Sequence, residues 1–141
     1  MIEIKENTLN VEIYLALRRA VNWKKLSQTQ AERALAGSLY TVLAYVDEKP
    51  VGMGRIVGDG AVISYIQDLV VLPEYQKMGI GKEVMKKLKQ YVESIREENT
   101  EMMLCLMCAK GREKFYEGLG FIGRPTDTLG PGMIMYLNEN K

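Results

Sequence analysis

The residues best suited to chemistry lie in one segment, Val71-Leu-Pro-Glu-Tyr-Gln-Lys-Met-Gly-Ile-Gly-Lys82. Its pattern is typical of a strand end and a short turn, followed by a glycine-bearing loop that begins an amphipathic helix. The N–H groups at a helix N-terminus point toward one spot, at the positive end of the helix dipole, and glycines leave room for a ligand. The segment therefore predicts a phosphate-binding site, and its residues are Gln76, Lys77, Met78, Gly79, Ile80, Gly81 and Lys82.

Two better-defined phosphate motifs do not fit this loop. A P-loop reads G-x-x-x-x-G-K-[ST], whereas this chain has Gln76 at the first position and Glu83 after the lysine. A dinucleotide-binding fingerprint needs a third glycine, and Val84 stands in its place. An ordinary turn between a strand and a helix stays the alternative interpretation.

The chain contains no histidine, which excludes Ser-His-Asp and Cys-His mechanisms. Catalysis must therefore use Tyr, Asp, Glu, Lys, water or the backbone. Cys105 and Cys108 form a C-x-x-C within an apolar run that is typical of a buried strand. Residues three positions apart in a strand face opposite sides, so the two thiols would diverge and we expect no redox pair. The chain has no histidine and no second C-x-x-C to complete a set of zinc ligands, so we expect no metal site.

Composition favours one domain over residues 1–141. The chain has 141 residues, of which 47% are hydrophobic, and this suits a single core. A net charge of +1 argues against a nucleic-acid partner. No apolar run reaches the ~18 residues that a membrane span needs. The charged N-terminal residues 1–6 do not resemble a signal peptide, so we expect a cytoplasmic protein with no membrane partner.

Apolar spacing predicts how these residues are positioned. Strands are predicted at 2–6, 40–46, 51–58, 61–71 and 102–108, with a final pair at 121–124 and 133–137. Helices are predicted to end near residues 22, 36, 96 and 118. Ser27 and Gln30 fit a capping box at the start of the second helix. Consecutive early strands favour the α+β class with a mixed sheet.

The chain contains two motifs in order, the glycine loop that follows Val71 and the run Phe115-Tyr116-x-x-x-Gly120-Phe121. Together they resemble motifs of the GNAT superfamily of N-acetyltransferases. The run Val71-x-Pro73-x-Tyr75-Gln76-x-x-Gly79-x-Gly81 is similar to the acetyl-CoA-binding motif of that family. Phe115-Tyr116-x-x-x-Gly120-Phe121 resembles its second signature. The resemblance implies a GNAT-like, mostly antiparallel sheet of about six to seven strands that is splayed at the cofactor site and flanked by about four helices.

The resemblance also implies acetyl-CoA as co-substrate, with its pyrophosphate on the glycine loop. The splayed strand would then offer backbone groups of Leu69 and Val71 to the pantetheine arm, as an added strand does. A backbone N–H near Val70 or Val71 is the candidate donor to the oxyanion. One departure from many relatives is Ala109, where they have an asparagine that contacts the coenzyme.

The implied reaction is direct attack of a neutral amine on the thioester. Tyr116 matches the family's general acid for the leaving thiolate. The resemblance implies that Tyr116 also contacts the coenzyme. For the general base we favour Asp68 acting through water, with Tyr65 as the alternative on the same strand. Glu74 and Glu113 are weaker candidates.

The acceptor is expected to be a small-molecule primary amine, and a protein lysine or N-terminal amine is the second candidate. Tyr14, Trp23 and Met133 could line its site or belong to the core. A non-catalytic acyl-CoA-binding or sensing domain is the alternative function, since fold alone does not guarantee chemistry. A homodimer that pairs through the late strands is expected by resemblance only.

Overall fold

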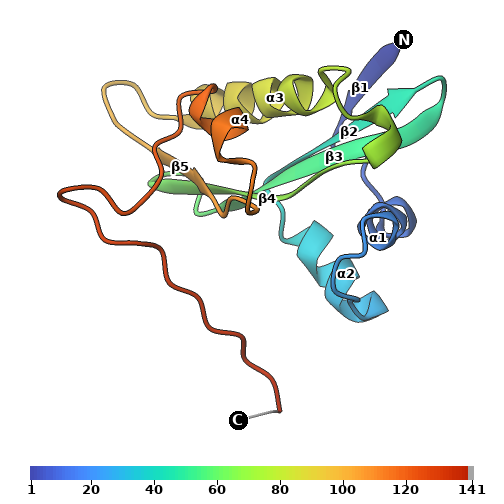
Figure 1. The fold of residues 1–141 in the computed structure, drawn as a ribbon, viewed down its shortest axis with the longest axis horizontal. Coiled ribbons are helices and arrows are strands. Elements are labelled where there is room, and N and C mark those ends of the chain that lie inside the picture. Colours follow the sequence, from blue (N-terminus) through green and yellow to red (C-terminus); the bar gives the residue numbers. More distant parts are fainter. Residues whose placement is uncertain (140–141) are drawn as a thin grey trace. The chain divides into compact units, whose positions relative to one another are not determined.

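A computed structural model of the protein describes residues 1–139, and its five strands form one sheet in chain order (Figure 1). The strands are β1 (Ile2–Glu6), β2 (Tyr40–Val46), β3 (Lys49–Gly58), β4 (Ile63–Val71) and β5 (Met103–Leu106). All neighbours are antiparallel except β4 and β5, which are parallel. The α+β class and the mixed sheet are confirmed, but the described chain has five strands rather than six or seven.

Three long helices cover the two faces of this sheet, with α3 (Ile80–Ile95) on one face and α1 (Val11–Ala20) and α2 (Gln28–Ala36) on the other (Figure 1). The capping box is confirmed, since the N–H of Gln30 donates to Ser27 Oγ at 3.0 Å and the N–H of Ser27 donates to Gln30 Oε1 at 3.3 Å. These bonds satisfy helix N–H groups that have no partner within the helix. Within the described part of the chain, no helix is long and apolar enough to cross a membrane.

Helix α3 packs closely on the sheet because β3 presents glycines to it. A Cβ at Gly54 would lie 2.9 Å from Leu88 Cδ1, and one at Gly52 would lie 3.2 Å from Ile80 Cγ2. Leu88 and Ile80 are fully buried in this contact, and each contributes roughly 1.5–3 kcal/mol of hydrophobic free energy. The glycines therefore fix the position of the helix whose first turn belongs to the predicted phosphate site.

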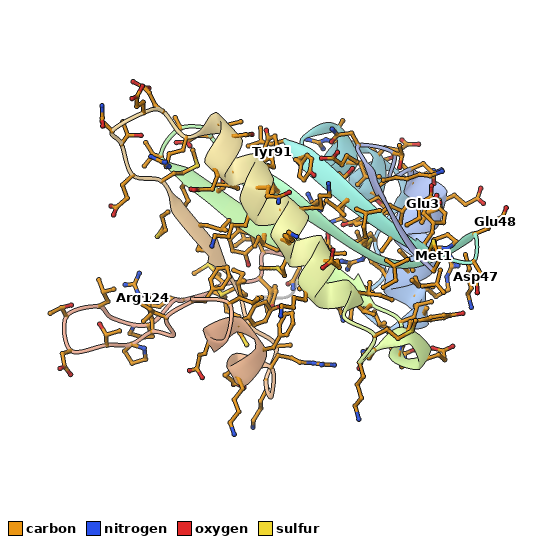
Figure 2. All side chains as sticks on the ribbon, turned by 90° about the horizontal axis from the view of Figure 1, so that it is seen from above. Met1, Glu3, Asp47, Glu48, Tyr91 and Arg124 are labelled. Atoms are coloured by element: carbon orange, nitrogen blue, oxygen red, sulfur yellow. The ribbon has the colours of Figure 1, made fainter. Side chains whose placement is uncertain are left out.

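The hairpin between β2 and β3 turns at Asp47 and Glu48, whose φ angles of 48° and 67° are those of a type I′ turn. This turn matches the right-handed twist of the strands that it joins. Figure 2 shows both residues beside Met1, whose amino group lies 3.6 Å from Asp47 Oδ1. The expected hairpin is thus confirmed, and it fixes the register of β3 against β2.

Strand β4 diverges from β5 halfway along its length. The two strands pair only from Ile63 with Met103 to Ile66 with Leu106, whereas β4 continues beside β3 as far as Val71. On the β5 side, the last five residues of β4 therefore have no strand partner among residues 1–139. The splayed sheet expected from the sequence is confirmed.

The chain divides into two compact units, residues 1–107 and the segment from Cys108 onward. The second unit contains one short helix, α4 (Glu113–Glu117). Its loop is ordered by hydrogen bonds, because Arg124 Nε (labelled in Figure 2) donates to the Gly130 carbonyl at 2.5 Å. The expected final strands at 121–124 and 133–137 do not form, because within the described chain neither segment has a strand to pair with.

Candidate functional site

The predicted phosphate loop connects the end of β4 to the start of α3. A short 3-10 turn, η1 (Pro73–Tyr75), follows β4, and Gly79 then precedes the helix with φ 82° and ψ 9°. No side chain caps this helix. A Cβ built on Gly79 would meet nothing within 4 Å. The N–H groups of the first turn of α3 are therefore left for an external acceptor, which is the arrangement that binds phosphate at a helix N-terminus.

The loop before the helix also presents backbone donors. The backbone hydrogen bonds of residues 1–139 do not use the N–H groups of Lys77, Met78 or Gly79. Lys77 has a φ of 70°, and alternation between right- and left-handed residues turns successive N–H groups toward one concavity. The N–H of Gln76, by contrast, donates to the Pro73 carbonyl at 3.3 Å. Gln76 instead holds the loop through its side chain, whose Nε2 donates to the Val71 carbonyl at 3.1 Å.

The direction of backbone groups in β4 distinguishes the three residues predicted to meet the pantetheine arm. The N–H of Leu72 donates to the Val51 carbonyl of β3 at 2.8 Å. Successive N–H groups of a strand point to opposite sides, so the N–H of Val71 points away from β3, toward the edge that β5 leaves open. The same alternation gives Val70 an N–H that points toward β3, but the register shift between Gln67 and Val70 interrupts the alternation at Leu69. The geometry thus favours Val71 over Val70 as a donor to a ligand, and the role of Leu69 stays a prediction.

Asp68 lies at an irregularity in β4. The register against β3 shifts between Met53 and Arg55, and Asp68 has a φ of 58°, which is rare for a residue with a side chain. The bulge directs the carboxylate to the sheet face that α1 covers. There its side chain is only 1% exposed.

Four side chains donate to the Asp68 carboxylate, and the longest of these bonds runs from Gln67 Nε2 to Oδ1 at 3.4 Å. The other three are shorter. Arg55 Nε lies 2.8 Å from Oδ2, Arg18 Nη1 lies 2.7 Å from Oδ1, and the Tyr14 hydroxyl lies 2.5 Å from Oδ2. Burial, followed by the hydrogen bond to Asp68, raises the pKa of Tyr14 above its usual range, so the phenol stays protonated. Because Asp68 holds two guanidinium groups and a phenol, its oxygen atoms are already engaged by the protein. The assignment of Asp68 as general base stays a prediction, and this geometry favours a role in holding the two arginines.

Tyr116 lies in the second unit, on α4, where it is half-buried. Its ring makes edge contacts with Phe115 and Phe121, at centroid distances of 5.1 and 6.0 Å. Burial, and then the nearby Cys108, raise the pKa of Tyr116 above the ordinary value of a phenol. A tyrosine that remains protonated in this way is suited to donate a proton, and its place at the coenzyme stays a prediction.

The other candidate bases have ordinary surroundings. The Glu113 carboxylate accepts the N–H of Gly111 at 2.9 Å, which is the role of a turn residue. Glu74 is exposed on η1, and Tyr65 is partly buried in β4. Both cysteines are free, and no cluster of residues within 1–139 could hold a metal ion.

The two arginines were not identified from the sequence, although a signal was present. Arg55 is the only charged residue in an otherwise apolar stretch from Val51 to Val57. Arg18 follows Tyr14 and Leu17 at helical spacing, so it lies on the buried face of α1. A charged residue in a core pattern indicates a buried partner. The identity of that partner required the bulge at Asp68, which the sequence does not reveal.

The chain matches one protein family and is similar in fold to several solved structures. The family model described as an acetyltransferase (GNAT) domain matches residues 11–130. An acetyltransferase of the GNAT family from Streptococcus pneumoniae is 31% identical, with a TM-score of 0.80 over 99% of each chain. An aminoglycoside N-acetyltransferase solved in complex with CoA has a TM-score of 0.69 over 99% of this chain and 95% of its own. At 14% identity, the second likeness shows the fold alone.

Among curated proteins, the chloroplastic GCN5-related N-acetyltransferase 1 of Arabidopsis thaliana is 28% identical over 138 residues. The match covers 94% of this chain but only 66% of the plant protein. The chain thus spans about two thirds of the length of this relative.

Proposed function

This chain belongs to the GNAT acetyltransferase family, and on that basis we propose that it transfers the acetyl group of acetyl-CoA to a primary amine. One observation carries the proposal, namely that no backbone hydrogen bond within residues 1–139 uses the N–H groups of Lys77, Met78 and Gly79, which directly precede the uncapped start of α3. A pyrophosphate fits a cradle of backbone donors at the positive end of a helix. The neighbouring outward N–H group of Val71 suits an extended amide-bearing arm, and we propose that the backbone of Leu69 also contacts this arm.

In the proposed reaction, the nitrogen of a neutral amine attacks the thioester carbonyl carbon. The C–N bond forms, the C–S bond breaks, and the products are an N-acetylated amine and free CoA. The amine proton passes to a base or to water, and the leaving thiolate takes the proton of the Tyr116 hydroxyl. The N–H of Val71 is the proposed donor to the carbonyl oxygen when that oxygen becomes negative.

We propose a small-molecule amine as acceptor, and a cytoplasmic location for the reaction. The α1 side of the sheet supports a small acceptor, because buried polar groups of Tyr14, Arg18 and Asp68 converge there. Such fixed polar groups select a ligand by its functional groups. The plant relative is named as chloroplastic, which is a property of that protein.

Thermal unfolding with and without acetyl-CoA tests the cofactor assignment first, with ATP and NAD as controls. At ~100 times Kd, a ligand stabilises a protein by ~2.7 kcal/mol. That corresponds to a rise in Tm of roughly 5–10 °C for a domain of this size. A rise with acetyl-CoA alone is the expected result. No rise at millimolar acetyl-CoA would mean that the loop is only a turn.

Release of free thiol from acetyl-CoA then tests the transfer itself. The expected result is a release that depends on an added primary amine and yields the N-acetyl product by mass spectrometry. If acetyl-CoA binds but no amine accelerates thiol release, the protein is a coenzyme-binding module and the proposed enzyme activity is wrong.

A further inference from the structure

The buried cluster around Asp68 contains more positive than negative charge. Two guanidinium groups, those of Arg18 and Arg55, share the single Asp68 carboxylate. Their side chains are 11% and 10% exposed. Buried charges in proteins are normally paired, because an unpaired one loses its hydration without compensation. Within residues 1–107, the cluster therefore carries one cationic charge without a bonded counterion.

Aromatic rings hold this excess charge in place. The Tyr14 ring lies 5.8 Å from the guanidinium of Arg18 and 5.7 Å from that of Arg55. The Trp23 ring lies 5.4 Å from the Arg18 guanidinium and is 40% exposed, so Arg18 sits between the buried cluster and solvent. Stacking of this kind orients a guanidinium without neutralising it.

Arg18 also retains hydrogen-bonding capacity. It donates through Nη1 to Asp68 and through Nη2 to the Lys24 carbonyl at 2.8 Å. Its Nε–H is buried and has no partner among the described residues. Since a guanidinium offers five donors in a planar fork, Arg18 is suited to a planar or tetrahedral anion.

The surrounding segment adds positive charge. Residues 10–37, which contain α1 and α2, carry five basic and two acidic side chains, although the whole chain has a net charge of only +1. Lys24 and Lys25 directly follow Trp23 in this segment. A local positive field of this kind attracts anions and raises their concentration near the site.

The cluster lies next to the proposed site of transfer. Asp68 belongs to the part of β4, residues 67–71, that β5 leaves open, and its side chain lies on the sheet face opposite α3. We propose that the acceptor is a primary amine that also carries an anionic group, a carboxylate or a phosphate, and that Arg18 binds this group. The inference rests on the proposed acetyl transfer and names the substrate class of the same site.

Paired acceptors test the inference. The carboxylate pair is 4-aminobutyrate and 4-aminobutanamide, and the phosphate pair is O-phosphoethanolamine and 2-methoxyethylamine, each compared at equal concentration of neutral amine. A hydrogen-bonded charge contact is worth about 10- to 100-fold in kcat/KM. We expect the anionic member of at least one pair to be preferred by that factor, and the pair that shows it distinguishes carboxylate from phosphate.

Arg18→Gln and Arg19→Gln form a matched set of variants, because both remove one positive charge from the last turn of α1 but Arg19 is exposed. Arg18→Gln should abolish the anion preference through KM and leave the acetyl-CoA thermal shift unchanged, whereas Arg19→Gln should retain the preference. If Arg18→Gln does not fold, Arg18→Lys replaces it and should weaken the preference without removing the charge.

Equal rates for both members of each pair would overturn the inference and leave the proposed function intact. Retention of the preference in Arg18→Gln would also overturn it. If no amine of the panel is acetylated, the inference is wrong, and the thermal shift with acetyl-CoA decides whether the proposed cofactor is wrong with it.

Discussion

At the scale of single residues, Tyr116 carries the clearest catalytic prediction. Tyr116→Phe removes the proposed proton donor to the thiolate and should lower kcat by roughly 10²-fold. The acetyl-CoA thermal shift should not change, because the ring and its contacts with Phe115 and Phe121 are kept. Tyr45→Phe on β2 is the control and should retain full activity. Steady-state thiol release measures both variants, and a wild-type rate for Tyr116→Phe across the pH range would remove Tyr116 from the mechanism.

The charge excess at Asp68 predicts an asymmetric effect on stability. Asp68→Asn would leave two buried guanidinium groups without a counterion and should lower the free energy of unfolding by about 3–5 kcal/mol. Arg18→Gln leaves one balanced pair of Arg55 and Asp68, so its cost should be only about 1 kcal/mol. Urea denaturation of the two variants measures the difference. Equal losses would show that the cluster is balanced by another group.

The pKa of Tyr14 predicts how stability responds to alkaline pH. Burial, then the hydrogen bond to Asp68, raises the folded-state pKa above the unfolded value of ~10. As pH rises, the unfolded chain therefore loses the Tyr14 proton before the folded protein does. The contribution of Tyr14 to the free energy of unfolding is fully present below pH ~10 and is lost as pH rises through the folded-state pKa. Tyr14→Phe should lower stability by roughly 1–2 kcal/mol at pH 8 and should show a shallower decline above pH 10. The decline is not abolished, because the pKa of Tyr40 is raised as well, chiefly by burial.

Urea denaturation between pH 8 and 11 measures that decline. Parallel curves for the wild-type protein and Tyr14→Phe would mean that Tyr14 ionises equally in both states. Tyr40 gives an independent comparison, since it bonds to Glu6 and stacks on Tyr91, labelled in Figure 2, at 4.4 Å.

At the scale of elements, Gly79 and Gly60 separate conformational strain from ligand binding. Both have positive φ angles, 82° and 74°, and a Cβ at either position would meet nothing within 4 Å. Alanine should therefore lower stability similarly at both sites, by about 1 kcal/mol. Only Gly79→Ala should also weaken acetyl-CoA binding, because its Cβ enters the phosphate cradle. Isothermal titration measures binding, and equal affinities for the two variants would place the coenzyme elsewhere.

Local signals in the sequence predicted most of the elements correctly. The capping box at Ser27, the turn at Asp47 and the apolar stripe of α3 each depend on residues close together in the chain. The bulge at Asp68 depends on register against β3, which no local pattern encodes. The position of the glycine loop was therefore predictable, whereas the ion cluster around Asp68 was not.

The two final strands were predicted from a local pattern but do not form within residues 1–139. Residues 133–137 are apolar and fit a buried strand, yet a strand also needs a neighbour to complete its hydrogen bonds. Within the described chain, that neighbour is missing. Sequence pattern can identify a segment that favours pairing, but the choice of partner is decided by the whole fold or by a second chain.

At the scale of the whole molecule, this same segment predicts self-association. Met133, Ile134, Met135, Tyr136 and Leu137 are exposed by 66–89%, and a continuous apolar surface of this kind marks an interface. We expect two copies to pair through it, as in the homodimer inferred from the family resemblance.

Ile134→Asp should shift the protein to monomer, because a buried unpaired carboxylate opposes association. Val62→Asp is the matched control, since Val62 is 68% exposed and Ile134 is 66% exposed, and it should leave association unchanged. Sedimentation equilibrium measures both variants, and a wild-type protein that sediments only at monomer mass would refute the pairing and leave the acetyl-transfer proposal untouched.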